Sequence, residues 1–502
     1  MIMNRAAGIL MHPTSLPGSR STGCLGAAAD RFLEFLCRAG QSLWQILPLG
    51  PTGYGDSPYS GYSAFAGNHL LIDLDLLQAD GLLTCSDIPA RTCASFRELE
   101  EVSLAPLMKA CRAFGHGGGW QSTEYETFEN AHVVWLPDYT LFRAIKASQG
   151  GRAWYDWPND LRNRHLKTIE STRRDLKEAV DFHRFLQFQF SKQWSRLRRA
   201  AREKGIRIIG DMPIFVAEDS ADVWAHPDLF DLTDSGRPAH IAGVPPDYFS
   251  RTGQRWGNPL YRWDRLARDG YSWWMDRFRV LLGLVDIIRV DHFRGFDQYW
   301  SIPASDRTAQ NGHWEPGPGA DFFSRAVTVL PDLPLIAEDL GVITPDVTAL
   351  RDRFAFPGMK ILQFAFGSGP GNDYLPHNYS SPRCVVYTGT HDNDTIRGWY
   401  RSLRPKRSSA RRAVNPCFAH LTEYLAGTHR TIHWDLIDLA MSSVAAWAIV
   451  PAQDIMGLGS EARMNLPGRA AGNWTWHLDS LDELDLHSDH LLSVTGRYNR
   501  RP

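Results

Sequence analysis

Short runs of apolar, β-prone residues recur along this chain, and they are followed by polar loop residues and helical patterns. Continuous apolar runs of this length are typical of strands that are buried on both faces, as in a parallel sheet. The eight runs are 8–11, 43–49, 206–216, 284–290, 335–337, 359–364, 384–388 and 447–450. Eight strands that alternate with helices favour a closed (β/α)8 TIM barrel, an α/β fold, over an open doubly wound sheet.

The uneven spacing of these runs predicts two insertions in the barrel. Between the second and third runs lies far more chain than one crossover helix needs. We therefore expect 79–201 to form an inserted, mostly helical subdomain, while 1–78 and 202–502 form the barrel. Between the third and fourth runs, 217–268 is rich in Pro, Gly, Asp and aromatic residues, so we expect a long loop over the cleft at the barrel mouth.

Local signals mark where individual helices begin. Thr344 stands in the position of a helix N-cap, Pro345 follows at the first helical position, and Asp346 adds a negative charge to the first turn. These residue types stabilise a helix start because they satisfy or complement the free N–H groups there. The sequence therefore predicts a helix that begins here, after the fifth strand, and a second, long helix over 176–205.

Composition and charge narrow the class of protein. Hydrophobic residues make up 43% of the 502 residues and the formal net charge is −2, so the chain can bury a large core and shows no basic excess for nucleic acid or anionic lipid. No run of about 18 apolar residues predicts a membrane span. Seven scattered cysteines without a C-x-x-C pair, and no signal-peptide pattern, favour reduced thiols in the cytoplasm. The basic tail 497–502 is expected to be solvated.

Polar side chains follow the predicted strands where each strand ends, which in a TIM barrel is the side of the active site. A lone acid at a strand end can simply cap a helix or pair with an arginine of the barrel rim. Acids at several successive strand ends favour one shared catalytic mouth instead. The polar residues at these ends are Asp211, Arg289, Asp291, His292, Glu338, Asp339, His391, Asp392, Asn393, Asp394, Gln453 and Asp454.

Two facing carboxyl groups suit glycosyl transfer, because one can attack the anomeric carbon while the other protonates the leaving oxygen. Arg289 lies two residues before Asp291, on the same side of the strand, so we expect it to keep the pKa of Asp291 low. Glu338 lies in the apolar context LIAEDLG, where burial is expected to raise its pKa. The pair therefore has the features of a nucleophile and a general acid.

Seven longer strings carry a resemblance to a known family. They are GPTGYGDSPYSGYSAFAGN (50–68), GDMPIFVAEDSADVWAHPDLF (210–230), GVPPDYFSRTGQRWGNPLY (243–261), IIRVDHFRGF (287–296), AEDLGVITPDV (337–347), YTGTHDNDT (387–395) and QDIMGLGSEARMNLPG (453–468). In this order they resemble signatures of the amylomaltases, the 4-α-glucanotransferases of the α-amylase superfamily. The region 79–201 matches that family in size and position, not by motif.

The resemblance implies a role for five residues at the strand ends. Asp291 in RVDHF resembles the family nucleophile, and Glu338 in AEDLG resembles the general acid/base. Asp392 in THDN resembles the third carboxylate, which binds sugar hydroxyls beside the reacting carbon. Arg289 and His391 stand where the family keeps supporting donors.

Further residues are candidates for binding substrate. The string 243–261 resembles a loop that overhangs the cleft, so its aromatic and amide side chains are expected to grip the glucan. For any single Trp or Tyr, a place in the core is an alternative. The candidates are Tyr59, Asp211, Tyr248, Gln254, Trp256, Asn393, Gln453 and Asn465.

The resulting hypothesis is a retaining 4-α-glucanotransferase that needs no metal or other cofactor. Its expected donors are maltooligosaccharides and starch- or glycogen-like α-glucans, and glucose is an expected acceptor. An α-glucan hydrolase of the same superfamily is an alternative, because it uses the same three acids. A non-catalytic glycan-binding barrel is a more distant one, since such a protein would lack at least one of these acids.

Overall fold

The computed structural model describes residues 3–18, 22–89, 93, 95–246, 250–404, 415–425, 431–469 and 471–502. Its main sheet has eight parallel strands in the order β10-β11-β12-β1-β2-β3-β6-β9. The backbone N–H of Ala337 in β9 donates to the carbonyl of Pro357, directly before β10, at 2.9 Å, so the two edges meet and the barrel nearly closes. The strands are β1 (Ala6–Leu10), β2 (Leu43–Gln45), β3 (Arg207–Pro213), β6 (Ile287–Asp291), β9 (Leu335–Ala337), β10 (Gly358–Ile361), β11 (Cys384–Tyr387) and β12 (Trp447–Pro451).

Each of the eight predicted apolar runs overlaps one of these strands, and the predicted barrel is confirmed. The runs are apolar throughout because both faces of the strands are buried: all residues of β1, β11 and β12 are buried. Side chains such as Ile209, Ile287 and Trp447 fill the interior of the barrel. The barrel is therefore a packed core, and a site can form only at its ends.

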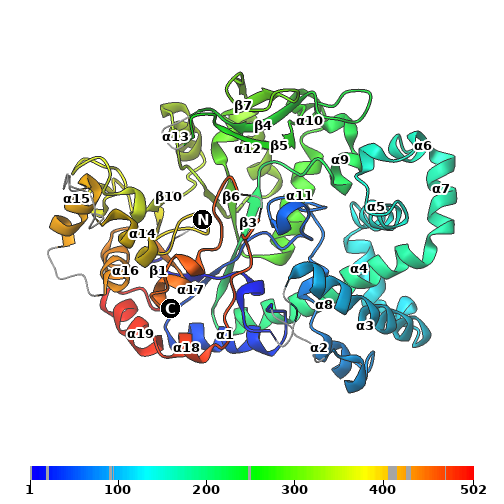
Figure 1. Cartoon of the computed structure of the whole chain (residues 1–502), viewed down its shortest axis with the longest axis horizontal. Helices are drawn as coiled ribbons and strands as arrows, with labels where there is room; N and C mark the ends of the chain where they lie inside the picture. Colours follow the sequence, from blue (N-terminus) through cyan, green and yellow to red (C-terminus); the bar gives the residue numbers. More distant parts are fainter. Residues whose placement is uncertain are drawn as a thin grey trace.

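The helices of the barrel surround this sheet (Figure 1). The helix predicted at 344–346 is α13, where the Thr344 side chain accepts from the backbone N–H of Val347 and Pro345 occupies the first turn. No helix in the described part of the chain combines the length and apolar character needed to cross a membrane. The helices are α1 (Ala27–Arg38), α11 (Ser272–Leu284), α12 (Gly319–Val329), α13 (Pro345–Arg353), α14 (Ile396–Leu403), α15 (Pro416–Leu425), α16 (Ile432–Ser442), α17 (Ala452–Ile455), α18 (Asp482–Asp485) and α19 (Ser488–Arg497).

Helices make up most of the chain between β2 and β3, and they lie together on the right of Figure 1. The long helix expected over 176–205 is α8, which buries one apolar side including Phe185, Trp194 and Leu197. We propose that 79–201 is a subdomain built on this helix. The helices are α2 (Leu74–Ala79), α3 (Phe96–His116), α4 (Thr123–Ala131), α5 (Leu136–Ser148), α6 (Asn159–Arg162), α7 (Leu166–Asp175) and α8 (Lys177–Glu203).

The segment 217–268, expected as a loop, contains regular structure. It includes α9 (Ala221–Ala225), β4 (His240–Val244), β5 (Gln254–Pro259) and α10 (Trp263–Arg268). Strands β4 and β5 pair with β7 (Gln298–Pro303) and β8 (His313–Pro316) in an antiparallel sheet of order β5-β4-β7-β8, seen at the top of Figure 1. The sequence did not predict this sheet because its strands are short, carry Gly and Pro, and pair with partners distant in the chain.

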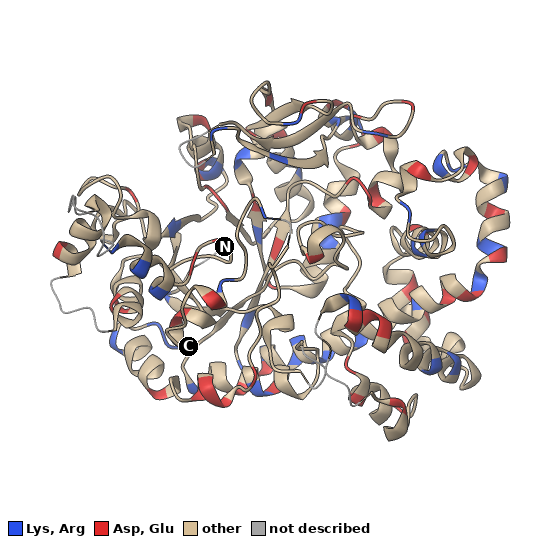
Figure 2. Cartoon of the chain, in the orientation of Figure 1, with Lys and Arg blue, Asp and Glu red and all other residues tan. Residues whose placement is uncertain are grey.

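The expectation of a solvated C-terminal tail is wrong for Arg500, although Arg497, Asn499, Arg501 and Pro502 are exposed. Arg500 is 0% exposed, and its guanidinium donates to carbonyl oxygens at the end of α16 and at the start of β1 and β12. These acceptors belong to segments far away in the chain, so a basic tail alone gives no sign of them. Elsewhere Lys and Arg alternate with Asp and Glu along the helices, in keeping with the small net charge (Figure 2).

Candidate active site

Arg289 is the centre of a buried charge cluster at the carboxyl ends of β3 and β6. Its Nη1 lies 2.7 Å from both carboxylate oxygens of Asp211 and 3.0 Å from Oδ1 of Asp291. The side chains of Arg289 and Asp211 are 4% and 0% exposed, whereas Asp291 keeps 30% of its side-chain exposure. Asp211 and Arg289 therefore form a fixed, buried ion pair. Asp291 is the member of the cluster that solvent and a ligand can reach.

Glu338 follows β9, the strand next to β6, so it lies beside Asp291. Its backbone N–H donates to the carbonyl of Val290 at 3.0 Å. Its Oε2 accepts from the backbone N–H of His292 at 2.7 Å, and its Oε1 accepts from the N–H of Leu340 at 3.1 Å. The carboxyl group of Glu338 is thus held by main-chain donors on both sides, one of them directly after Asp291.

The two acids have different electrostatic surroundings. Burial raises the pKa of Asp291 to about 6, and Arg289 opposes this shift. Arg289 lowers this pKa as expected, but desolvation of Asp291 outweighs the nearby positive charge, so the net shift is upward. Burial and the charge of Asp291 raise the pKa of Glu338 well above its usual value. The pair can hold one proton at neutral pH, with Glu338 as the group that carries it.

Asp392 lies in the loop that follows β11, and its side chain is 47% exposed. His391 Nε2 is 3.4 Å from Oδ2 of Asp392, and the amide Nδ2 of Asn465 donates to Oδ1 at 2.6 Å. Both carboxylate oxygens therefore have a neighbour that fixes their direction. Asn393, in contrast, uses its Oδ1 to accept from the backbone N–H and the hydroxyl of Thr390, so it shapes the turn.

Tyr59 contacts both the buried Asp211 and His391 in the loop after β11. Its hydroxyl donates to Oδ2 of Asp211 at 2.7 Å. Its ring stacks on His391, with ring centroids 5.1 Å apart and an angle of 21° between the planes. Trp474 packs against both rings, at 5.7 Å from Tyr59 and 5.9 Å from His391. One aromatic cluster thus links the buried Asp211–Arg289 ion pair to the loop that bears Asp392.

Two of the predicted substrate-binding residues, Gln254 and Trp256, lie on β5. The Trp256 ring is 38% exposed and meets the His292 ring edge to face at 4.9 Å, so it lies beside the residue that follows Asp291. The Trp256 indole N–H donates to Oε1 of Gln254 at 3.2 Å. Tyr248 lies outside the described residues.

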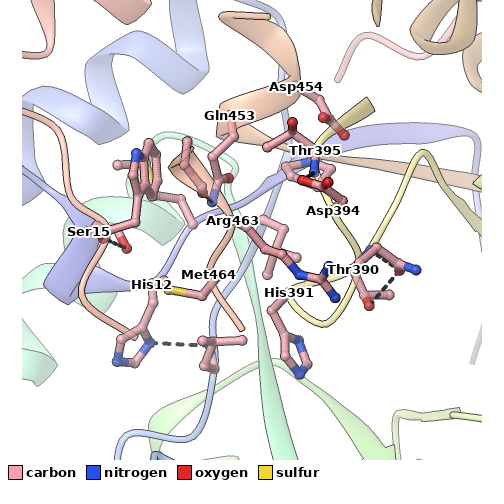
Figure 3. A pocket seen from close by; sticks show the side chains of 17 residues that line it. His12, Ser15, Thr390, His391, Asp394, Thr395, Gln453, Asp454, Arg463 and Met464 are labelled. Atoms are coloured by element: carbon pink, nitrogen blue, oxygen red, sulfur yellow. Dashed lines mark hydrogen bonds between the residues drawn. The ribbon is translucent and has the colours of Figure 1, made fainter. Parts of the chain in front are cut away.

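Gln453 is 8% exposed, and its amide donates to the carbonyl of Ala462 at 3.3 Å. It lines a pocket next to His391, between the loops that follow β1, β11 and β12 (Figure 3). This hydrogen bond holds the loop after β12 in place. In this structure Gln453 therefore supports a loop of the site. Within the described residues, no group of three or more His, Cys, Asp or Glu is arranged to hold a metal ion.

The comparisons with known proteins identify the family. A family model described as 4-alpha-glucanotransferase matches residues 11–482. The chain belongs to the 4-α-glucanotransferase family. The assignment predicted from the motifs is therefore confirmed, and the family is a transferase family rather than a hydrolase family.

Individual relatives agree with this assignment along the whole chain. The chain is 51% identical over 488 residues to a 4-alpha-glucanotransferase of Thermus thermophilus, covering 95% of each protein. It is 48% identical over 512 residues to one from Synechocystis, covering 100% of this chain and 99% of the relative. The structure of the amylomaltase from Streptococcus agalactiae in complex with acarbose is similar, with a TM-score of 0.92, 36% identity and coverage of 99% and 100%.

Two residues of the site in this glucanotransferase were missed by the sequence analysis as functional candidates: Arg463 and Trp474. His292 and Trp474 have left-handed backbones, with φ of 54° and 66°. Such a conformation is unusual for bulky residues and is often found at functional sites. Arg463 donates to the backbone carbonyl of Asp392. The sequence shows neither a backbone angle nor a contact between distant loops, so no pattern singled out Trp474, or Arg463 within the motif 453–468.

Proposed function

We propose that this 4-α-glucanotransferase moves α-1,4-glucan segments by a retaining double displacement, with Asp291 as nucleophile and Glu338 as general acid/base. The observation that carries the proposal is the arrangement around Arg289. One buried guanidinium contacts the partly exposed carboxylate of Asp291, and a carboxyl group with a raised pKa lies at the end of the next strand. This arrangement provides one ionised and one protonated acid in the same cleft.

In the first step, a carboxylate oxygen of Asp291 attacks the anomeric carbon of the donor sugar. The bond from this carbon to the glycosidic oxygen breaks, and Glu338 gives its proton to that oxygen. The products are a shortened glucan and a sugar joined covalently to Asp291. Arg289, 3.0 Å from Asp291, offsets the negative charge of the free carboxylate before attack.

In the second step, Glu338 acts as a base and takes the proton from the 4-hydroxyl of an acceptor glucan or of glucose. The acceptor oxygen attacks the anomeric carbon, and the bond to Asp291 breaks. Two inversions give net retention and a new α-1,4 bond. Asp392, directed by Asn465 and His391, binds hydroxyl groups of the reacting sugar and helps to distort its ring.

Transfer rather than hydrolysis requires that a sugar reach the covalent intermediate before water does. The half-exposed ring of Trp256, beside His292, offers an apolar surface on which an acceptor sugar can stack. We propose maltooligosaccharides and longer α-glucans as donors. The complex of the similar S. agalactiae amylomaltase with acarbose supports an α-glucan-like ligand.

Incubation with maltotriose tests this function. Transfer is expected to produce glucose together with chains longer than three units, whereas a hydrolase produces only shorter chains. Asp291→Asn and Glu338→Gln are expected to lower turnover by several orders of magnitude while glucan binding is largely kept. Wild-type turnover in either variant would refute the assigned roles.

We further propose that the enzyme works in the cytoplasm, which the odd number of scattered cysteines supports. Fractionation of the source cells with an activity assay on maltotriose tests this location. Activity in a secreted fraction would contradict it.

A further inference from the structure

Arg463 connects two loops of the active site. It follows the short 3-10 helix Ser460–Ala462 in the chain after β12. Its Nη2 donates to the backbone carbonyl of Asp392 at 2.5 Å, and its Nε donates to the backbone carbonyl of Asn465 at 2.7 Å. Figure 3 shows its side chain extending across the pocket toward Thr390 and His391.

The two carbonyl groups that Arg463 holds belong to a pair of residues that also contact each other. Asn465 donates from its side chain to Oδ1 of Asp392 at 2.6 Å and from its backbone to the carbonyl of His391 at 3.0 Å. Arg463 therefore fixes the main chain of both the third carboxylate and the amide that orients it. A planar guanidinium suits this task, because its N–H groups point in fixed directions toward two acceptors.

We propose that Arg463 is a positioning residue for Asp392, and that it sets the direction in which this carboxylate meets the reacting sugar. The proposal rests on the proposed function, in which Asp392 binds sugar hydroxyls and helps to distort the ring. The hydrogen bonds of Arg463 go to the backbone carbonyls of Asp392 and Asn465, so in this proposal it acts through these two residues.

The loop that bears Arg463 has other attachments, so it stays in place without the guanidinium. Gln453 donates to the carbonyl of Ala462, the backbone N–H of Trp474 donates to the carbonyl of Met464, and the Asn473 side chain accepts from the N–H of Leu466. Loss of the Arg463 side chain therefore removes the restraint on Asp392 but leaves the fold of the loop. A loss of activity in a variant whose loop keeps its fold therefore indicates a positioning role rather than a purely structural one.

The kinetic consequence is a fall in kcat with little change in KM. Contacts of a group that helps to distort the sugar become stronger as the transition state forms, so a misdirected carboxylate costs more there than in the ground state. A displacement of about 1 Å in a catalytic site lowers the rate by roughly 100-fold. We expect a loss of this order in Arg463→Ala, with KM for maltotriose within about threefold of wild type.

The test compares Arg463→Ala with and without added methylguanidinium, a small cation that can occupy the space left by the side chain. Rescue of kcat by at least tenfold at saturating methylguanidinium is expected. Arg397→Ala is the matched control, because the Arg397 guanidinium also donates to a backbone carbonyl, that of Gly457. In the part of the chain that the structure describes, it forms no ion pair with Asp291, Glu338 or Asp392. Wild-type kcat in Arg463→Ala, or an equal loss in both variants, would overturn the proposal.

Arg463→Lys provides the same test if the alanine variant does not fold. Its ammonium group keeps the charge but lacks the fork that reaches two carbonyl oxygens. We expect a reduced kcat, an unchanged KM and no rescue by methylguanidinium, since the lysine fills the space. Wild-type kcat in this variant would likewise contradict the role.

Asp392→Asn separates a failure of this proposal from a failure of the proposed function. If Asp392→Asn keeps wild-type activity, the role of the third carboxylate is wrong. If it loses activity while Arg463→Ala does not, only the positioning role is wrong. Adding Arg463→Ala to Asp392→Asn is expected to cause no further loss, because Arg463 acts through Asp392. A full additional loss would show that it acts elsewhere.

Discussion

The backbone N–H of His292 donates a hydrogen bond of 2.7 Å to Oε2 of Glu338. His292 directly follows the proposed nucleophile, and its left-handed backbone, with φ of 54°, accompanies the turn of its N–H toward the neighbouring strand. The acid/base is therefore attached to the same main chain that carries Asp291. The relative placement of the two acids is built into the junction of β6 and β9 rather than left to flexible side chains.

The pH dependence of kcat/KM is expected to follow the two raised pKa values of this pair. Asp291 must be ionised and Glu338 protonated, so activity should rise as pH increases through about 6 and fall above the raised pKa of Glu338. The two limbs belong to the coupled pair rather than to either residue alone. Initial rates on maltotriose between pH 4 and 10 measure the profile. An acid limb near pH 4, the usual range of an exposed Asp, would contradict the role of burial.

Removal of the guanidinium in Arg289→Ala should destabilise the fold and shift the acid limb. Asp211 is fully buried and would lose its charged partner, which typically costs about 3–5 kcal/mol. Arg289 also lowers the pKa of Asp291, so its loss moves the acid limb to higher pH. Urea unfolding and the pH profile measure the two effects.

Arg198→Ala is the control for this variant, because Arg198 forms an ion pair with Asp286 at 2.9 Å. Among the described residues, no hydrogen-bond acceptor of its guanidinium is a proposed catalytic acid; the acceptors belong to Gly283, Val285 and Asp286. It should lose stability and keep the wild-type pH profile. A wild-type acid limb in Arg289→Ala would show that the arginine does not control Asp291.

Tyr59→Phe tests the link between the buried charges and the aromatic cluster. The change removes the 2.7 Å hydrogen bond to Asp211 but keeps the ring that stacks on His391. Hydrogen bonds to charged groups contribute about 1.5–3 kcal/mol, so a loss of stability in this range is expected, together with a lower kcat. Tyr387→Phe is a matched control, since it removes a hydrogen bond of 2.8 Å to Gln45 inside the barrel. Equal activity losses in the two variants would argue against a specific role of Tyr59.

Arg500→Ala should weaken the fold without affecting catalysis. The variant leaves several buried carbonyl oxygens without their donor, so we expect a loss of at least about 3 kcal/mol. Burial lowers the pKa of Arg500 to about 9. Below that pH the guanidinium is charged in both the folded and the unfolded protein, so it adds no pH dependence to the stability there. Thermal unfolding at pH 7 measures the loss.

Arg501→Ala, at the next and exposed position, should change stability by less than about 0.5 kcal/mol. The kcat of Arg500→Ala should equal that of wild type at temperatures where the variant is folded. Similar stability in the two variants would contradict the structural role of Arg500.

The sequence predicted those parts of the fold that depend on local pattern. The fully buried strands are continuous apolar runs, and the Thr344 cap precedes a proline at the start of α13. The second sheet was missed because β5 has no buried apolar run, and because β4 pairs with β7, a strand later in the chain. Arg500 was missed because its acceptors lie on three distant segments.

The candidate site was predicted as far as the strand ends determine it. Asp291 is the last residue of β6, Glu338 follows β9 directly, and Asp392 lies in the loop after β11. The net shift of the Asp291 pKa was not predictable, because it is a balance between burial and Arg289 that depends on coordinates. The contact of Arg463 with Asp392 joins two loops that no sequence pattern relates.

Covalent trapping tests the central claim most directly. With Glu338→Gln and α-maltosyl fluoride, the first step proceeds because fluoride leaves without a proton, while the second step lacks its base. Mass spectrometry of the digested protein is expected to find a maltosyl group on Asp291, and none in the Asp291→Asn/Glu338→Gln double variant. Fluoride release with the sugar attached to another residue, or with no adduct at all, would contradict the account.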